Sequence, residues 1–402
     1  MIPADFPDGS FAHGHPHALY ERIRAAGGVV RHPSLPLWVT GTHAEVRAVA
    51  GDPAAYRSGD GILIPEIGHP YDAPPTIMHT DPPEHARYRG YIAPAFRPSV
   101  MRRLEGAIRD RIRALLAPAE PGRPFDVVGG LAVPLPLQVI GLLLGIPEDD
   151  WPRFFRWSEA FVPGAADLPA AERDALRLEC GAYLVGIAHE RRADPRDDVI
   201  TLLALARPGG QPLTDLELVM YLVQLLVAGN ETTRHAISGG LLALAEHPAQ
   251  WAALRERPDG LPAAVEEILR WTSPVVYFLR TATRPMELGG RKIAAGEHVM
   301  LLYGAANRDP DAFGPDADRF DTTRFDTARS GAARDAAGLA FGYGPHFCLG
   351  AALARLEIRL LLEELMSRHE HVTVAGTPAY NGSPVVIGLR HCELAFAGVT
   401  RD

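Results

Sequence analysis

One short segment, Phe341–Gly350, combines a cysteine with closely spaced glycines. Cys348 comes directly before a stretch of helical periodicity that starts at Leu349. The unpaired N–H groups and dipole at a helix N-terminus stabilise a thiolate, so we expect the pKa of Cys348 to be lowered and its sulfur to bind a metal. The alternative is a buried structural cysteine, as we expect for Cys180 and Cys392. Backbone close to a flat ligand, with an aromatic ring under it, is predicted at Gly342, Gly344, Gly350 and Phe341.

A second unusual segment is polar within an apolar helix. Ala228–Thr233 reads Ala-Gly-Asn-Glu-Thr-Thr and follows the nearly all-apolar Tyr221–Val227. Gly, Asn and Thr are poor helix formers, and burial of Glu231 costs free energy unless the carboxylate is paired or hydrated. A threonine hydroxyl can bond back to a carbonyl and open a notch for a diatomic ligand. We interpret the segment as functional, the alternative being a helix with a polar face toward solvent.

Together these two segments resemble the cytochrome P-450 superfamily in its soluble bacterial form. The resemblance extends from about His17 to Phe396. It implies a mainly α cytochrome P-450 fold, with a long central helix over the haem and a small β-rich region. It also implies haem b, with Cys348 as the axial ligand whose thiolate pushes electron density onto the iron. Glu231 would deliver protons, Thr232 would hydrogen-bond the activated dioxygen, and Ala228 and Gly229 would leave room beside the haem.

The resemblance assigns two further groups of charged residues. Partners for the haem propionates would be His85, Arg89, Arg280 and His346, although each could also be an ordinary surface charge. Glu267 and Arg270 stand three apart, which by itself is common and worth only ~0.2–0.5 kcal/mol on an exposed helix. In the family this spacing marks a buried pair that stabilises the cysteine side of the core, and we expect Arg319 to be its third member.

The substrate pocket follows only from positions in the family. All but one of its candidates are apolar, which predicts a hydrophobic substrate, and any of them could equally be ordinary core. Gln224 is the one polar candidate that could orient a ligand. The candidates are Ile62, Leu63, Ile64, Gln224, Val227, Ala228, Val276, Phe278 and Val385.

The elements that must position these residues are mostly helices. Thr214 and Glu217 form a capping-box pattern that predicts a long helix from Asp215 to Glu246. We expect a single domain over residues 1–402, with a helical body at about 83–272 and 349–368. Within that body, one continuous helix is predicted for Val127–Leu144. The β-rich parts are predicted at about 28–41, 275–302 and 372–396.

Composition restricts the possible partners. The chain has 402 residues and a net charge of −9 without a basic run, which argues against nucleic acid as a partner. Three widely spaced cysteines and the lack of a long apolar run indicate a cytoplasmic protein without a membrane segment. No flavin or iron–sulfur motif is found, so we expect electrons from a separate ferredoxin and ferredoxin reductase. A docking patch, or simply a solvated surface, is expected at Arg87, Arg97, Arg102, Arg103, Arg355 and Arg359.

The leading hypothesis is a haem-thiolate monooxygenase that inserts one oxygen atom of O2 into a hydrophobic small molecule. Parts of the chain resemble bacterial members that act on steroids, terpenoids or other secondary metabolites. One alternative is a peroxide-driven peroxygenase, but that chemistry would not need the proton relay of Glu231 and Thr232. Another alternative is a non-catalytic haem protein.

Overall fold

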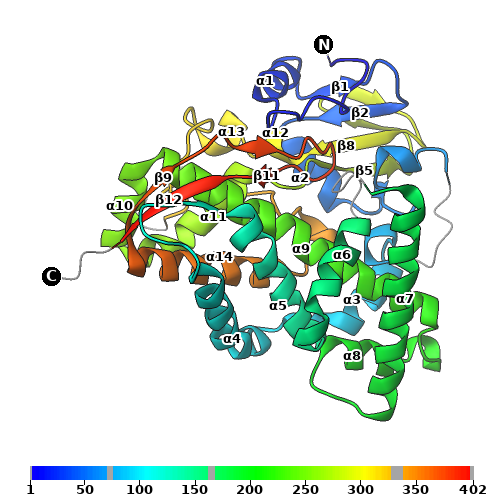
Figure 1. Cartoon of the computed structure of the whole chain (residues 1–402). Coiled ribbons are helices and arrows are strands. Elements are labelled where there is room, and N and C mark those ends of the chain that lie inside the picture. Colours follow the sequence, from blue (N-terminus) through cyan, green and yellow to red (C-terminus); the bar gives the residue numbers. More distant parts are fainter. Residues whose placement is uncertain (1, 70–75, 162–167, 327–337, 399–402) are drawn as a thin grey trace.

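The computed structural model describes residues 2–69, 76–161, 168–326 and 338–398 (Figure 1). Within these ranges, helices form most of the molecule. They are α1 (His17–Ala25), α2 (His43–Gly51), α3 (Glu84–Ile92), α4 (Pro98–Leu116), α5 (Pro134–Leu144), α6 (Trp151–Phe161), α7 (Ala170–Ala193), α8 (Val199–Leu205), α9 (Asp215–Glu246), α10 (Pro248–Glu256), α11 (Leu261–Thr272), α12 (Tyr303–Ala306), α13 (Pro310–Phe313) and α14 (Ala351–Arg368).

The long helix α9 runs through the helical body, and helices α5, α6, α7, α11 and α14 pack against it (Figure 1). Its predicted start is confirmed. The Thr214 side chain accepts a hydrogen bond from the Glu217 N–H, and the Glu217 carboxylate accepts one from the Thr214 N–H at 2.7 Å. This reciprocal cap satisfies two N–H groups that the helix itself leaves unpaired.

A five-stranded sheet forms the β-rich part next to the N-terminus (Figure 1). Its order is β1 (Val29–Arg31), β2 (Leu37–Thr40), β8 (His298–Leu302), β5 (Tyr277–Ala282) and β3 (Tyr56–Arg57). The predicted hairpin β1–β2 is antiparallel, whereas β2 and β8 pair in parallel, with Leu37 opposite His298. The sheet therefore joins segments from both ends of the chain.

Smaller sheets complete the β structure of the described residues. A three-stranded antiparallel sheet has the order β4 (Pro124–Asp126), β12 (Glu393–Gly398) and β9 (His369–Val374). Two hairpins are formed by β6 (Met286–Leu288) with β7 (Arg291–Ile293) and by β10 (Ala379–Tyr380) with β11 (Leu389–His391). The predicted strand-rich regions near 275–302 and 372–396 are thus confirmed.

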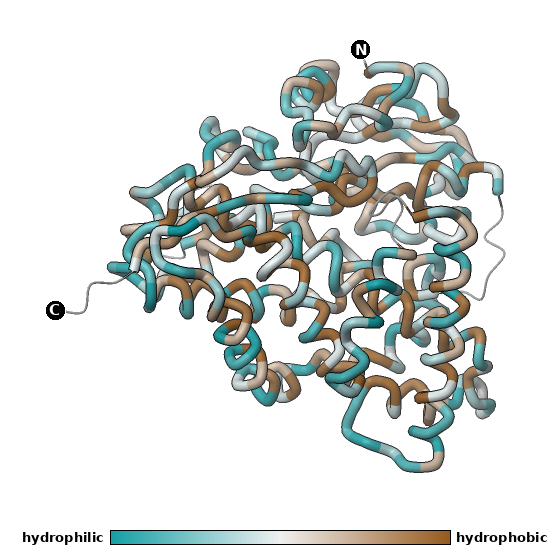
Figure 2. Tube along the Cα trace, in the orientation of Figure 1, coloured by the Kyte–Doolittle hydropathy of each residue, from teal (hydrophilic) through white to brown (hydrophobic). Residues whose placement is uncertain are grey.

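The prediction of one helix over Val127–Leu144 is wrong. A single π-helical turn, Val128–Ala132, precedes α5, which begins at Pro134. Proline lacks an N–H and fits the first turn of a helix better than its interior, so the chain starts a new helix there. Figure 2 shows hydrophobic residues mainly along the packed helices and hydrophilic residues along the outer loops. No helix in the described ranges is long and apolar enough to cross a membrane.

Candidate active site

The cysteine loop is held close to the N-terminal part of the molecule. The Cys348 N–H donates to the Phe341 carbonyl at 2.9 Å, which closes the loop on itself. Gly344 has a φ of +72°, and a Cβ there would lie 2.4 Å from the carbonyl oxygen of Ala50 in α2. The loop therefore needs glycine at this position, both for its backbone conformation and for the close approach to α2. Arg355 stacks over the Phe341 ring at 4.5 Å from its centroid.

Cys348 is solvent-accessible although protein surrounds it, as expected for a side chain that opens into an internal space. The predicted lowering of its pKa is wrong for the chain alone. Desolvation by the surrounding protein raises the pKa of the Cys348 thiol, and this outweighs the opposing effects of the Gly350 and Ala351 amides and of Arg89. The Gly350 and Ala351 amides do lower the pKa of the thiol, as expected at a helix start. An added positive charge would be needed to lower it enough for the thiolate to form.

Four cationic or basic side chains converge near this loop. The rings of His85 and His346 lie 4.3 Å apart, centroid to centroid, and Ser58 is hydrogen-bonded to His346 at 3.1 Å. Burial and the charges of Arg280, His85 and Arg89 lower the pKa of His346 to about 2. The same environment lowers the pKa of His85, for which burial is the main cause and Arg89 the next.

This cluster lacks negative partners. Arg280 is buried, and its guanidinium donates to the carbonyl oxygen of its neighbour Leu279, at 2.7 Å. Within the described ranges, neither Arg89 nor Arg280 forms an ion pair, and the buried Nε2 of His85 has no hydrogen-bond partner. The nearby Asp81 carboxylate instead accepts backbone N–H groups at 2.7 and 3.0 Å. The buried guanidinium of Arg280 and the half-buried one of Arg89 fit an anionic ligand, and the two propionates of a haem would supply that charge.

On α9, the polar segment has the predicted back-bond. The Thr232 hydroxyl donates to the Ala228 carbonyl at 3.0 Å, one turn earlier. The helix nevertheless continues without a break from Asp215 to Glu246. Ala228 is exposed even though other elements surround α9, so this turn also borders an internal space. Ala228 on α9 and Cys348 in the cysteine loop are thus both accessible, although each lies on an element that packs against others.

Glu231 is buried and has charged neighbours that the sequence did not reveal. Its Oε2 lies 2.7 Å from Arg234 Nη2 and 3.7 Å from His235 Nε2. Arg234 also bonds to Glu159 of α6 at 3.1 Å. Burial raises the pKa of Glu231 to about 7, with Arg234 acting in the opposite direction and Glu159 in the same direction. A carboxyl group with this pKa can both hold and release a proton near neutral pH.

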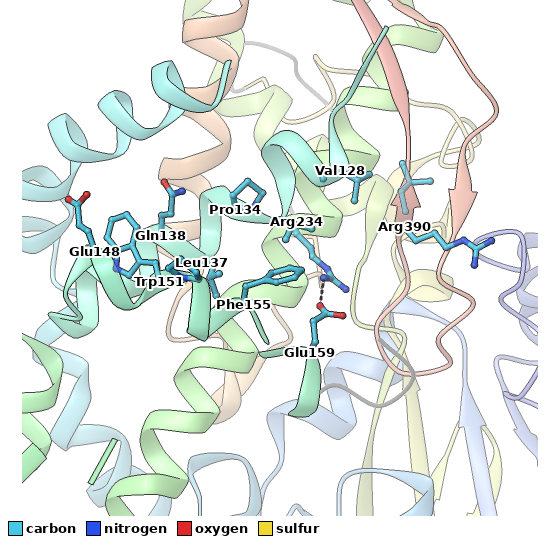
Figure 3. Close-up of a pocket in the computed structure, with 14 residues that line it drawn as sticks. Val128, Pro134, Leu137, Gln138, Glu148, Trp151, Phe155, Glu159, Arg234 and Arg390 are labelled. Carbon is cyan, nitrogen blue, oxygen red and sulfur yellow. Dashed lines mark hydrogen bonds and ion pairs between the residues drawn. The ribbon is translucent and has the colours of Figure 1, made fainter. Parts of the chain in front are cut away.

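The Arg234–Glu159 pair also lines a pocket of about 700 Å³ (Figure 3). In Figure 3 the two side chains point toward each other beside Phe155. The pocket lies among α5, α6, α9 and β11, and its lining includes neither Cys348 nor any of the predicted substrate residues. It is therefore separate from the cysteine loop, and its contact with the site is through Arg234 and Glu159.

Known proteins resemble this chain over most of its length. A family model described as Cytochrome P450 matches residues 182–381. The erythromycin C-12 hydroxylase of Saccharopolyspora erythraea is 41% identical, over 91% of this chain and 91% of its own. The methyl-branched lipid omega-hydroxylase of Mycobacterium bovis is 36% identical, over 98% of this chain and 92% of its own.

The chain belongs to the cytochrome P450 family. A solved structure of a mutant of P450 EryK in complex with erythromycin B superposes with a TM-score of 0.83 at 36% identity, covering 96% of this chain and 97% of that one. The predicted family and fold are confirmed. As a P450, the protein is a monooxygenase that hydroxylates hydrophobic small molecules, and the cofactor of its family is haem.

The Glu267–Arg270 pair of this P450 is fully buried. Arg270 binds the carboxylate through two nitrogens, each at 2.7 Å. Arg319 was expected as the third member, but that expectation is wrong, because its side chain is exposed and only its carbonyl accepts from Arg270, at 3.0 Å. The third side chain is Arg324, which is buried with its Nε 3.4 Å from Glu267 Oε2. Both arginines lie in the same irregular segment, so spacing alone did not distinguish them.

The predicted substrate residues of the P450 fall on four segments of the chain. Leu63, Ile64, Val276 and Val385 belong to one apolar cluster beside the five-stranded sheet. The Val276 N–H donates to the Val385 carbonyl at 2.9 Å, which brings these two segments together. Phe278 packs in the neighbouring cluster with Tyr303. Ile62 is buried, whereas Gln224 and Val227 of α9 are partly exposed.

Proposed function

We propose that Cys348 would hold the iron of a haem b in this P450 through its thiolate. The cluster of His85, Arg89, Arg280 and His346 carries this proposal, because its two guanidinium groups form no ion pair with the described residues and supply the charge that two propionates need, while the histidines add hydrogen-bonding groups. Iron(III) at Cys348 would add the positive charge that overcomes the desolvation of the thiol. The amides of Gly350 and Ala351 would then temper the electron donation of the sulfur.

The haem, when bound, supplies the activation of O2 and the insertion of one oxygen atom into the substrate. We propose that Glu231 holds the proton for this chemistry. The Thr232 hydroxyl, next to Ala228, would hydrogen-bond the O2 that receives the proton. Protons would reach Glu231 from the pocket shown in Figure 3, past Arg234 and Glu159. The support is the burial of Glu231, its pKa of about 7, and the position of Arg234 between the acid and the pocket.

The proposed substrate is a hydrophobic secondary metabolite, such as a steroid, terpenoid or branched lipid. The support is the apolar character of the candidates on the sheet side and on α9. The two relatives above are named as an erythromycin C-12 hydroxylase and a methyl-branched lipid omega-hydroxylase. Gln224 is the polar side chain proposed to orient the substrate.

The proposed electron donors are a ferredoxin and its reductase, in the cytoplasm. Four of the six patch residues already form ion pairs with carboxylates of this chain, namely Arg87, Arg103, Arg355 and Arg359. Arg97 and Arg102 are exposed, and no ion pair with the described residues is found for either. An acidic partner would therefore meet mainly these two guanidinium groups. The buried Cys180 and Cys392 are free thiols, which suits a reducing compartment.

The test of ligation is the absorption spectrum of the dithionite-reduced protein under carbon monoxide, with Cys348→Ser as the matched variant. Wild type is expected to show the strongly red-shifted Soret band of a thiolate ligand, and the variant is expected to lose it. A wild-type protein without this shift would overturn the ligand assignment. The proton role is tested separately by Glu231→Gln, which should consume NADH and O2 with less product while the carbon monoxide spectrum stays the same.

A further inference from the structure

His235 lies one helical turn after Glu231 and is enclosed in the core, with 1% of its surface exposed. Its Nε2 has three polar neighbours. These are Asn381 Nδ2 at 3.3 Å, Arg234 Nε at 3.5 Å and Glu231 Oε2 at 3.7 Å. One ring nitrogen therefore faces the proposed proton carrier, its arginine and a residue of the β10–β11 hairpin.

The orientation of the Asn381 side chain is fixed by its own hairpin. Its Oδ1 accepts hydrogen bonds from the N–H groups of Ser383 at 3.2 Å and Gly388 at 3.3 Å. Its Nδ2 donates to the Val386 carbonyl at 2.9 Å. A flipped amide would place its NH2 group against the two N–H donors and its oxygen against the Val386 carbonyl, so all three bonds would be lost. The atom that faces His235 is therefore the NH2 group, which only donates.

The tautomer of His235 follows from this. Arg234 Nε is also only a donor, so two donors point at His235 Nε2, which must carry a lone pair. Burial and the charge of Arg234 lower the pKa of His235 well below its ordinary value, so the ring is neutral. The proton then sits on Nδ1, which has no hydrogen-bond partner among the described residues. The ring is also tightly enclosed, because a Cβ at Gly388 would lie 2.1 Å from this nitrogen.

Glu231 Oε2 lies 3.7 Å from this nitrogen, which carries the lone pair. An ionised carboxylate would be repelled by it, whereas a protonated carboxyl group could donate a hydrogen bond to it after a small rotation. The other charged neighbours act in known directions, since Arg234 of α9 favours the ionised form and Glu159 of α6 favours the protonated form. The hairpin residue Asn381 is neutral, and Arg390 lines the pocket beyond Arg234.

We propose that His235, held in one tautomer by Asn381, is a positioning residue that keeps Glu231 in its proton-carrying form and directs its proton. The inference rests on the proposed role of Glu231 as proton donor. His235 itself does not touch substrate or cofactor in this assignment. The buried Nδ1–H without a partner lowers the stability of the fold. We infer that the residue is kept because it orients Glu231.

The first test is the tautomer of His235 in the holoenzyme. The diamagnetic, carbon monoxide-bound ferrous protein is labelled with ¹⁵N-histidine, and the signals of His235 are assigned by their loss in His235→Gln. The expected spectrum has a protonated Nδ1 and an unprotonated Nε2. A proton on Nε2, or on both nitrogens near neutral pH, would overturn the proposal. This measurement needs no variant to be active.

The second test is the titration of Glu231 by infrared spectroscopy, using the protonated-carboxyl band that disappears in Glu231→Gln. His235→Leu removes the acceptor and should increase the acid dissociation constant of Glu231 about tenfold, which moves the midpoint to lower pH. His235→Gln offers a side-chain oxygen in the same region and should restore a midpoint near that of wild type. An unchanged or higher midpoint in His235→Leu contradicts the inference.

The two proposals fail in different ways. If Glu231→Gln makes product as efficiently per NADH as wild type, the proton role of Glu231 is wrong, whatever the tautomer of His235. If Glu231→Gln uncouples the reaction but His235→Leu leaves both the Glu231 midpoint and the coupling unchanged, only the role of His235 is wrong. Each variant must first show the wild-type carbon monoxide spectrum, so that a folding defect is not read as a loss of coupling.

Discussion

The buried carboxyl of Glu231 should make the stability of the protein depend on pH in a way that one substitution removes. Burial raises the pKa of Glu231 to about 7 from its ordinary 4.5. The folded chain therefore holds a proton that the unfolded chain has lost between these values. Stability from this group is fully present below about pH 4.5 and is lost as the pH rises through about 7.

The size of the effect follows from the same values. A tenfold change in an acid dissociation constant corresponds to about 1.4 kcal/mol, so the shift in the pKa of Glu231 amounts to about 3 kcal/mol. Glu231→Gln keeps the shape and cannot ionise. We therefore expect the unfolding free energy of the variant to gain about 3 kcal/mol relative to wild type between pH 4.5 and pH 8.

Urea denaturation of both holoproteins at a series of pH values measures this difference, with the Soret band and tryptophan fluorescence as independent probes. Glu172→Gln, on the exposed surface of α7, serves as the control and should differ from wild type by a constant amount. A difference between Glu231→Gln and wild type that stays within about 0.5 kcal/mol over the whole range would refute the assignment of a buried, protonated carboxyl.

Three other substitutions test the rest of the site. Arg270→Met should lower the unfolding free energy by about 3–5 kcal/mol in urea denaturation, because it leaves Glu267 as a buried charge without its two-point partner. Arg319→Ala should change it by no more than about 0.5 kcal/mol, and equal losses in the two variants would contradict the structure. Gly344→Ala should cost about 1–3 kcal/mol and lower the haem content of the purified protein, since its φ is +72° and its Cβ would strike α2. A normal haem content and melting temperature would show that the loop can relax. Thr232→Val should keep the carbon monoxide spectrum but form less product per NADH consumed. An unchanged ratio of product to NADH would show that the hydroxyl takes no part in proton delivery.

Local patterns predicted much of the fold and the outline of the site. The capping box at Thr214 located the start of α9, and the β-rich part predicted at about 28–41 contains the β1–β2 hairpin. These features depend on neighbours in sequence, so they are visible in the sequence alone. Pro134 also carried a local signal for a helix start, which periodicity over Val127–Leu144 concealed.

What could not be predicted depends on contacts between distant segments. Glu159 reaches Arg234 from another helix, and Asn381 reaches His235 across 146 positions of sequence. The choice of Arg324 over Arg319 is likewise made by how an irregular segment folds over α11. The pKa of Cys348 was predicted from its helix start, but the desolvation that dominates comes from the whole surrounding fold.

The parallel pairing of β2 with β8 has a consequence for synthesis of the chain. The hairpin β1–β2 leaves the ribosome early, but Leu37 must wait for His298 before its outer edge is covered. Until then the strand offers unpaired backbone groups to any other strand it meets. The cysteine loop follows about 40 residues later still. With Cys348 as the proposed ligand, haem can be captured only after β8 and the cysteine loop have both been synthesised.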